Sequence, residues 1–390
     1  MRIKQIMLDK YHKMKSDKYK KIVFSLMQDN DFKPINNIRP KHIDTICFVL
    51  KEILPYRGGI TSVLRLGTGL SKKGYQVFYS VIASDPISSL DDAAKKNLMN
   101  YSGQIIKYKR DQNYDVVIAT AMETVSYAKK LNGYKMYFVQ DYEPLFFAYG
   151  DLYTLAQNSY EQGFHMVSLG QWNAEMVKRE CNVCSPIDVV DFPYEPSEYT
   201  RVERNFEAYK SKQDFTMAVY IKVNSRRMPY ILQYVLTELK NKLKVRDHIN
   251  LKIYYFGEDT WFECMEGTNL GRLAKDELCD LYHKTDFGAV ISLTNISLVP
   301  YEMIATGLPV LEYKKGSFST FFDEESAILF GLDSEELYNK ILFMIKHPQN
   351  LEKMTHHAQT YLNNQTWSKT ITQFDDIIKK LPMDGTDINL

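Results

Sequence analysis

Apolar residues recur along the chain in short continuous runs that alternate with stretches of helical periodicity. The first such run, Thr45–Leu50, is typical of a strand buried on both faces of a parallel sheet. A helix is expected from Ile60 to Lys72, with Gly74 closing it. Further strands are expected at 77–83, 116–120, 136–139 and 166–169. Strand and helix in repeated alternation predict a doubly wound α/β sheet.

The pattern lapses between Pro193 and Asp214 into charged, aperiodic sequence, and we expect a domain boundary there. A second alternation follows, with strands at 215–221, 251–256, 287–293 and 310–313 and helices at 230–243, 275–283 and 301–306. The tail 334–381 is expected to be largely helical. Two Rossmann-like lobes predict a cleft that faces the C-terminal strand edges of both sheets.

Four parts are therefore expected. They are an N-terminal helical extension, 1–42; a first Rossmann-like lobe, 43–200; a second Rossmann-like lobe, 201–365; and a C-terminal helix and tail, 366–390, long enough to cross back to the first lobe.

Composition narrows the classes of function. The net charge of the 390 residues is +1, so no overall field favours nucleic acid as a partner. Five scattered cysteines do not make a disulfide framework, and the single C-x-x-C at Cys181 and Cys184 has no second pair at zinc spacing. We therefore predict no metal and no cofactor. Without an apolar run of about 20 residues or a secretory leader, a cytoplasmic protein is expected.

The N-terminal extension is strongly basic. Its first 25 residues hold two aspartates against eight basic residues, Arg2, Lys4, Lys10, Lys13, Lys15, Lys18, Lys20 and Lys21. Apolar residues recur among them at roughly helical spacing: Ile3, Ile6, Met7, Tyr11 and Met14. This pattern is typical of a helix that lies on an anionic membrane, at the inner face of the cell membrane here, and equally of a solvated helix attached to a domain.

Two loops of the second lobe have the composition of an anion site. Lys222 and Arg227 follow the expected strand 215–221 and precede a helix, whose N-terminus is the positive end of its dipole. In the segment 294–310, Pro300 stands near a helix start, Glu302 is expected in the first turn to accept hydrogen bonds from a ribose, and Gly307 ends the helix. Solvated charges on loops are the plain alternative.

These loops and their neighbours resemble the donor-binding half of retaining glycosyltransferase family 4, which has the GT-B fold. The resemblance lies in the Leu270-Gly-Arg272 turn, the Asp276-Glu-Leu-x-x-Leu-Tyr282 helix, and Glu302 followed by Gly307-Leu-Pro-Val310. In the first lobe, Arg57-Gly-Gly-Ile-Thr61 resembles the glycine loop of the family, and Gln140-Asp-Tyr-Glu-Pro144 stands where many members carry a His-Asp type motif.

The resemblance implies glycosyl transfer with retention from a nucleotide-sugar donor to a glycan or lipid-linked acceptor. It implies catalytic roles for Lys222, Arg227 and Asp141. The implied donor-binding residues are Gly58, Gly59, Arg272, Leu273, Ser297, Leu298, Val299, Tyr301 and Glu302. The implied contacts with acceptor or sugar are Gln140, Glu143 and Thr294. For Asp141 and Glu143, capping of the helix at Pro144 is the structural alternative.

One position departs from the family pattern. Thr294 stands where the first of two signature glutamates contacts hydroxyls of the donor sugar. With the two first-lobe motifs, this departure most resembles bacterial rhamnosyltransferases of rhamnan and S-layer glycan synthesis, so the implied donor is dTDP-L-rhamnose. A UDP- or GDP-hexose donor, a sugar-nucleotide epimerase, a two-lobed sugar-binding module and a catalytically silent partner of another transferase remain as alternatives.

Overall fold

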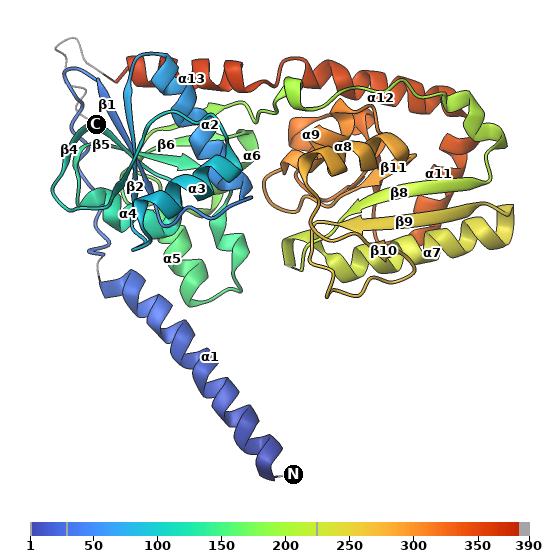
Figure 1. Ribbon diagram of the computed structural model, residues 1–390, viewed down its shortest axis with the longest axis horizontal. Helices are drawn as coiled ribbons and strands as arrows, with labels where there is room; N and C mark the ends of the chain where they lie inside the picture. The colour runs from blue at the N-terminus through green and yellow to red at the C-terminus, as the bar shows by residue number, and fades with distance from the viewer. Residues whose placement is uncertain (1, 29, 224, 382–390) are drawn as a thin grey trace. The chain divides into compact units, whose positions relative to one another are not determined.

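The computed structural model describes residues 2–28, 30–223 and 225–381, without the side chains of residues 2–6, 8 and 225. The chain forms two compact units. The first contains residues 1–169, 173–189 and 374–390, and the second contains residues 170–172 and 190–373. Each unit is a sheet with helices, as Figure 1 shows, and each is described separately below.

The first unit is built on a seven-stranded sheet of order β3-β2-β1-β4-β5-β6-β7. The strands are β1 (Thr45–Leu50), β2 (Gln76–Val81), β3 (Gln104–Lys107), β4 (Asn113–Ala119), β5 (Asn132–Val139), β6 (His165–Leu169) and β7 (Ile187–Val190). Strands β1 to β6 pair in parallel. The strand order reverses between β1 and β4, and ligands bind at such switch points.

Helices alternate with these strands. They are α2 (Gly58–Lys72), α3 (Ile87–Asn97), α4 (Met122–Lys129), the 3₁₀ turn η1 (Glu143–Phe146), α5 (Asp151–Ser159) and α6 (Gln171–Glu180). Helix α2 begins at Gly58, so the two glycines expected to form a loop are its first turn. This places their backbone N–H groups at the C-terminal edge of β1, at the positive end of the α2 dipole.

The N-terminal extension, expected to be helical over 1–42, contains one helix, α1 (Arg2–Gln28), and its residues 30–42 form neither helix nor strand. Only the last turns of α1 pack on the unit, where Val23 and Leu26 lie against a small cluster of Met122, Leu152 and Ala156. Every described side chain from Met7 to Ile22 is exposed. The side chains of Arg2, Ile3, Lys4 and Ile6 lie outside the described set, so the expected stripe is observed only from Met7 onward.

The second unit has a six-stranded sheet of order β10-β9-β8-β11-β12-β13, with every pairing parallel. The strands are β8 (Asp214–Tyr220), β9 (Asn250–Phe256), β10 (Thr268–Asn269), β11 (Phe287–Ala289), β12 (Val310–Tyr313) and β13 (Ile328–Phe330). The order reverses between β8 and β11. The loops after these two strands therefore open at the switch point of the second sheet.

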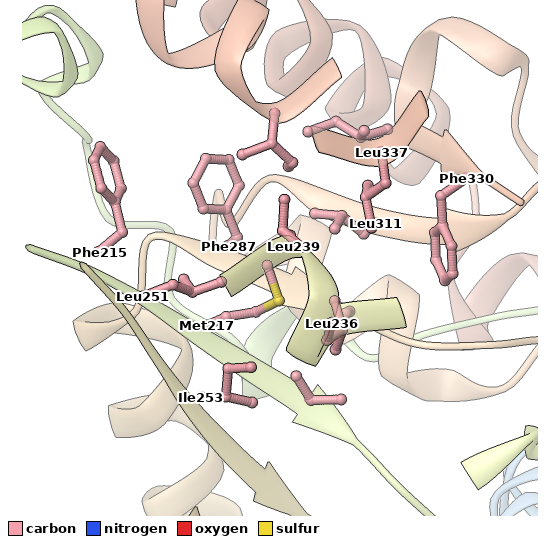
Figure 2. Close-up of a cluster of buried hydrophobic side chains, with 14 of the residues drawn as sticks. Phe215, Met217, Leu236, Leu239, Leu251, Ile253, Phe287, Leu311, Phe330 and Leu337 are labelled. Atoms are coloured by element: carbon pink, nitrogen blue, oxygen red, sulfur yellow. The ribbon is translucent and has the colours of Figure 1, made fainter. Parts of the chain in front are cut away.

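The helices of this unit alternate with its strands and follow the last of them. They are α7 (Pro229–Asp247), α8 (Lys275–Lys284), α9 (Leu298–Ala305), α10 (Phe318–Phe321), α11 (Ser334–Lys346), α12 (Pro348–Leu362) and α13 (Trp367–Lys379). Figure 2 shows the core between α7, α11 and the sheet, where Met217, Leu236, Leu311 and Leu337 pack together. Helix α13 enters the first unit at its end, where Phe374 packs against Phe138 and Tyr75 donates to Asp375.

Four strands escape the sequence pattern: β3, β7, β10 and β13. None is longer than four residues, and each carries a partly polar or incomplete apolar run that periodicity cannot separate from a loop. Strand β11 is also shorter than expected and ends at Ala289, because the apolar run beyond it continues as buried loop. Helix α9 begins at Leu298, so Glu302 lies in its second turn rather than its first.

Candidate functional site

The loop after β8 carries the two basic residues of the expected anion site. It runs from Ile221 to Met228 and includes a 3₁₀ turn, Ser225–Arg227, before α7 begins at Pro229. Met228 takes a left-handed conformation (φ 40°, ψ 53°), which turns the chain sharply into the helix. Lys222 is half-buried, whereas Arg227 is buried. The two cations therefore have different surroundings.

Arg227 points into the second unit. Its Nη1 donates to the carbonyl of Ile291, 2.6 Å away, in the loop after β11, and its guanidinium lies 5.7 Å from the centre of the Tyr220 ring. Nearby, the buried Glu312 accepts hydrogen bonds from the Ser292 hydroxyl and the Tyr313 N–H. Burial raises the pKa of Glu312 to about 7, against the opposing effects of these hydrogen bonds and of the Arg227 charge. Arg227 thus ties two loops of the sheet edge together.

Glu258, which directly follows Gly257 at the end of β9, sits beside Lys222. Its carboxylate accepts the backbone N–H of Val223 at 2.9 Å and that of Asp259 at 3.1 Å. Burial opposes ionisation, but these N–H groups and the charges of Lys222 and Arg272 hold the pKa of Glu258 below its usual range. Glu258 therefore fixes the loop that carries Lys222.

Arg272 and Leu273 lie in the turn between β10 and α8. The Arg272 guanidinium pairs with both carboxylate oxygens of Asp259, with N–O distances of 2.8 Å. Leu273 beside it is half-buried. The turn implied to bind the donor thus lies next to the Lys222 loop, because Asp259, which pairs with Arg272, directly follows Glu258.

The N-terminus of α9 lies at the switch point. Ser297 is its N-cap residue and has extended backbone geometry, but its side chain makes no capping hydrogen bond. The Ser297 Oγ and the Tyr301 hydroxyl are both buried and have no hydrogen-bond partner in the structure. Leu298 and Val299 are half-exposed. The first N–H groups of α9 and a polar atom beside them are therefore available to an anionic ligand.

Glu302 is held in a cage of tyrosines. The Tyr282 hydroxyl donates to its Oε2 at 3.1 Å, and the Tyr199 hydroxyl also donates to the carboxylate. Burial raises the pKa of Glu302, while the two hydroxyls act in the opposite direction. The expected ribose contact is therefore a buried carboxylate whose orientation is fixed by two aromatic side chains. Thr294, four residues before α9, is also buried.

In the first unit, the structure brings Gly59 and Gln140 together. A Cβ atom on Gly59 would lie 3.4 Å from Gln140 Oε1, so the first turn of α2 abuts the end of β5. Gln140 Nε2 lies 3.5 Å from the Thr120 carbonyl, and the Asp141 carboxylate accepts the N–H of Tyr142 at 2.9 Å. Gly58, Gly59, Gln140 and Asp141 therefore share the C-terminal edge of the first sheet.

Glu143 has structural partners. Both of its carboxylate oxygens accept the N–H of Met122 at the start of α4, and the Tyr137 hydroxyl donates to Oε1 at 3.0 Å. Burial and the nearby Glu123 raise the pKa of Glu143 to about 8. The carboxylate thus caps α4, rather than the turn at Pro144 that the sequence suggested. These partners give Glu143 a structural role in the first unit, and its contact with acceptor or sugar stays a prediction.

Several residues of the site escape sequence reasoning. Glu258 and Asp259 stand in a loop without a motif, and Tyr199 lies in the aperiodic segment assigned to a domain boundary. Only Tyr282 had a signal, as the last residue of the helix motif. Burial raises the pKa of Cys181, the first thiol of the C-x-x-C pair, to about 12, so this thiol is protonated at neutral pH. Among the described residues, no group of three or more potential ligands has a metal-binding arrangement.

Comparison with known proteins agrees with this architecture. A family model described as glycosyl transferase-like matches residues 233–376. Sucrose-phosphate synthase from Thermosynechococcus elongatus is similar over 87% of this chain and 99% of its own, with 12% identity and a TM-score of 0.64. HepE from Anabaena, in complex with UDP and glucose, is similar over 87% and 100%, with 12% identity and a TM-score of 0.65. The fold is that of the GT-B glycosyltransferases.

Other comparisons add to the GT-B assignment. A glycosyltransferase from Rickettsia africae covers 88% of this chain and is itself covered fully, with 12% identity and a TM-score of 0.64. A search of curated protein sequences finds no match to the chain. In this GT-B fold, Lys222 and the start of α9 lie at the switch point of the second sheet, and Glu258 lies beside Lys222 in the loop after β9. None of the helices in the described ranges is both long and apolar enough to cross a membrane.

The raised pKa of Glu143 predicts a pH-dependent stability. A carboxyl that titrates near pH 8 when folded and near 4.5 when unfolded binds more protons in the native state between these values. Its contribution to stability is therefore full below about pH 4.5 and is lost as pH rises through about 8. Relative to the wild type, Glu143→Gln should gain roughly 4 kcal/mol in unfolding free energy between pH 5 and pH 8.5. Urea unfolding at both pH values measures this.

The exposed Glu175 on α6 gives the matched control. Glu175→Gln should leave the difference between the two pH values unchanged. If Glu143→Gln shows the same pH dependence as the wild type, the carboxyl is ionised in the native protein at pH 5 and the cap on α4 is a charged one.

Proposed function

We propose that this chain is a GT-B glycosyltransferase that binds a nucleotide-linked sugar through its second unit and transfers the sugar to a glycan or lipid-linked acceptor. One observation carries the proposal. The loops after β8 and β11 bring Lys222, Arg227 and the N-terminus of α9 to one sheet edge, with a buried carboxylate, Glu302, behind them. Cations and free N–H groups match a diphosphate, and a fixed carboxylate matches ribose hydroxyls.

Each residue then has a distinct role. Lys222 and the first N–H groups of α9 stabilise the negative charge that develops on the departing diphosphate, while Arg227 holds the loop of Lys222 in place and adds a buried positive charge. In the first unit, Gly58 and Gly59 offer backbone N–H groups at the end of β1, and we assign the contact with the acceptor to Asp141 and Gln140. The bond from the anomeric carbon to the diphosphate oxygen breaks, and that oxygen takes the proton of the acceptor hydroxyl. The new bond forms on the same face, so configuration is retained.

Replacing Lys222 tests the phosphate loop more cleanly than replacing Arg227, because Arg227 also holds the Ile291 carbonyl. Lys222→Ala should lower turnover by about 10²- to 10³-fold, since one such contact to a developing anion contributes about 3 kcal/mol. It should also weaken binding of UDP and dTDP, measured by calorimetry. Lys284→Ala, at an exposed lysine of α8, should change neither quantity. Normal turnover and normal nucleotide binding in Lys222→Ala would sink the assigned loop.

For the donor sugar we propose L-rhamnose carried by dTDP. The support is the likeness of the first-lobe motifs to rhamnosyltransferases and the presence of Thr294 where a carboxylate would otherwise contact sugar hydroxyls. Ile296 is buried just before α9, and the half-exposed Leu298 and Val299 in the first turn of α9 offer an apolar wall to a 6-deoxy sugar. A UDP- or GDP-hexose is the alternative, and the similar HepE structure contains UDP and glucose. Because Thr294 replaces the first signature glutamate, a second alternative is that the chain is a catalytically silent partner of another transferase.

Donor competition decides among these. The wild-type chain, supplied with an acceptor extract, should turn over dTDP-L-rhamnose at least tenfold better than UDP-glucose, UDP-GlcNAc or GDP-mannose. A single methyl or hydroxyl contributes about 1–3 kcal/mol to discrimination, so weak activity with the others is expected. A tenfold preference for a hexose donor would overturn the rhamnose assignment alone. Nucleotide binding without acceptor-dependent release of nucleoside diphosphate would favour the silent partner.

Helix α1 carries exposed basic and apolar side chains that favour contact with an anionic membrane. Its described lysines, Lys10, Lys13, Lys15, Lys18, Lys20 and Lys21, are exposed along more than two turns, with Met7, Tyr11 and Met14 exposed between them. A basic helix with exposed apolar side chains is attracted to anionic lipid, by about 1 kcal/mol per basic residue near the surface. We propose that α1 brings the enzyme to an anionic membrane that carries a lipid-linked acceptor.

A full-length variant with glutamine at Lys10, Lys13, Lys15 and Lys18 tests this role. Its affinity for phosphatidylglycerol vesicles at low salt should fall at least tenfold in a sedimentation assay, and wild-type binding should fade as salt rises. A control variant with glutamine at Lys210, Lys252, Lys284 and Lys353, all exposed, keeps the net charge equal. Equal partitioning of the two variants would leave α1 as a solvated helix.

A further inference from the structure

The second unit carries a group of exposed aromatic side chains beside the Lys222 loop. Tyr230 and Tyr234 lie one turn apart near the start of α7, and Trp261 and Met265 lie in the loop after β9; we call these four residues the aromatic patch. Their exposed fractions are 66%, 60%, 68% and 47%. Exposed apolar side chains that gather in one place mark interaction sites, whereas single ones are ordinary.

The patch is one surface because its two segments are joined beneath it. The buried Phe262 lies 6.0 Å from the ring of Tyr230 and 6.0 Å from that of Trp261, measured between centroids. Gln233 on α7 accepts the N–H of Met265 at 2.8 Å. The rings are thus held by a packed side chain and a hydrogen bond, so their spacing is built into the fold.

The position of the patch relates it to the proposed donor site. Tyr230 is the third residue after Arg227, and Trp261 is the third after Glu258, whose carboxylate binds the N–H of Val223. Both segments therefore start from residues that hold the Lys222 loop. A ligand on the patch lies beside the place where we propose that sugar is transferred.

The charge around the aromatic patch and its exposed area limit the kind of ligand that it can bind. The segment 257–267 contains four carboxylates and no basic residue. Two of them are paired, Asp259 with Arg272 and Glu266 with Lys240, and Glu263 is exposed beside Phe262. With Lys222, Lys240 and Arg272 beside these carboxylates, the segment is close to neutral and slightly acidic, so its charge does not favour anionic lipid or anionic polymers. Three aromatic side chains at two-thirds exposure offer about 400 Å², half of the roughly 800 Å² per partner that a stable dimer needs.

We propose that the aromatic patch binds a neutral glycan chain. The C–H faces of pyranose rings stack on the electron-rich faces of aromatic rings, and carboxylates such as that of Glu263 accept hydrogen bonds from sugar hydroxyls. The part of this inference that makes the glycan the acceptor rests on the proposed function. A chain held at the patch has a raised effective concentration at the transfer site, so longer acceptors bind more tightly than short ones.

Binding to an array of neutral and anionic oligosaccharides of two to eight units, without donor, tests the patch. The wild type should bind neutral chains of four or more units, and both Trp261→Ala and Tyr234→Ala should weaken that binding at least tenfold. Phe343→Ala, at an exposed aromatic of α11, should not. Because the substituted side chains are exposed, thermal unfolding of all three variants should match the wild type.

Four results would overturn the proposal. They are no binding to any neutral chain, undiminished binding in the Trp261 and Tyr234 variants, vesicle binding that Trp261→Ala abolishes, and a dimer that Trp261→Ala dissociates. Titration with UDP and dTDP keeps the two proposals apart. If glycan binding is absent and nucleotide binding is normal, only the proposal of a glycan-binding patch is wrong. If glycan binds but nucleotide does not, the proposed transferase function is wrong and the proposal of the patch stands.

Discussion

The buried guanidinium of Arg227 organises the edge of the second sheet. By donating to the Ile291 carbonyl, it joins the loop after β8 to the loop after β11, across the point where the strand order reverses. The loop beyond Ile291 continues through Ser292, which Glu312 anchors on β12, to the start of α9. The position of the α9 N-terminus therefore depends on the buried, positively charged side chain of Arg227. A charge in such a position is stable only with its partners, so the loops and the cation hold one another.

Three glutamates, the half-buried Glu143 and the buried Glu302 and Glu312, show how differently the fold uses one residue type. Glu143 caps a helix in the first unit, Glu312 fixes a loop in the second, and Glu302 faces two tyrosine hydroxyls at the proposed ribose site. Burial raises the pKa of each. Only Glu302 has partners that a ligand can replace without unravelling a helix or strand. A raised pKa thus accompanies two structural roles and one proposed binding role.

The sequence predicts the long elements and the general place of the site. Continuous apolar runs such as Thr45–Leu50 and Phe215–Ile221 predict buried parallel strands, because few other structures use them. Strand β10 has only two residues and gives no such run. It is recognised as a strand only by its pairing with β9 in the folded chain. Motif spacing placed Lys222, Arg227 and Glu302 together, but no pattern could show that Arg227 turns inward. Tyr199 reaches Glu302 from a segment with no periodicity at all, so only the folded chain reveals it.

The cage around Glu302 also constrains how this sequence can diverge. Loss of the carboxylate alone would leave the Tyr199 and Tyr282 hydroxyls buried without an acceptor, and an unsatisfied buried polar group costs about 1–3 kcal/mol. Loss of one tyrosine hydroxyl would deprive a buried carboxylate of a donor. A substitution at any of these three positions therefore destabilises the protein least when the other two positions change as well. Residues 199, 282 and 302, far apart along the chain, should evolve as a correlated set.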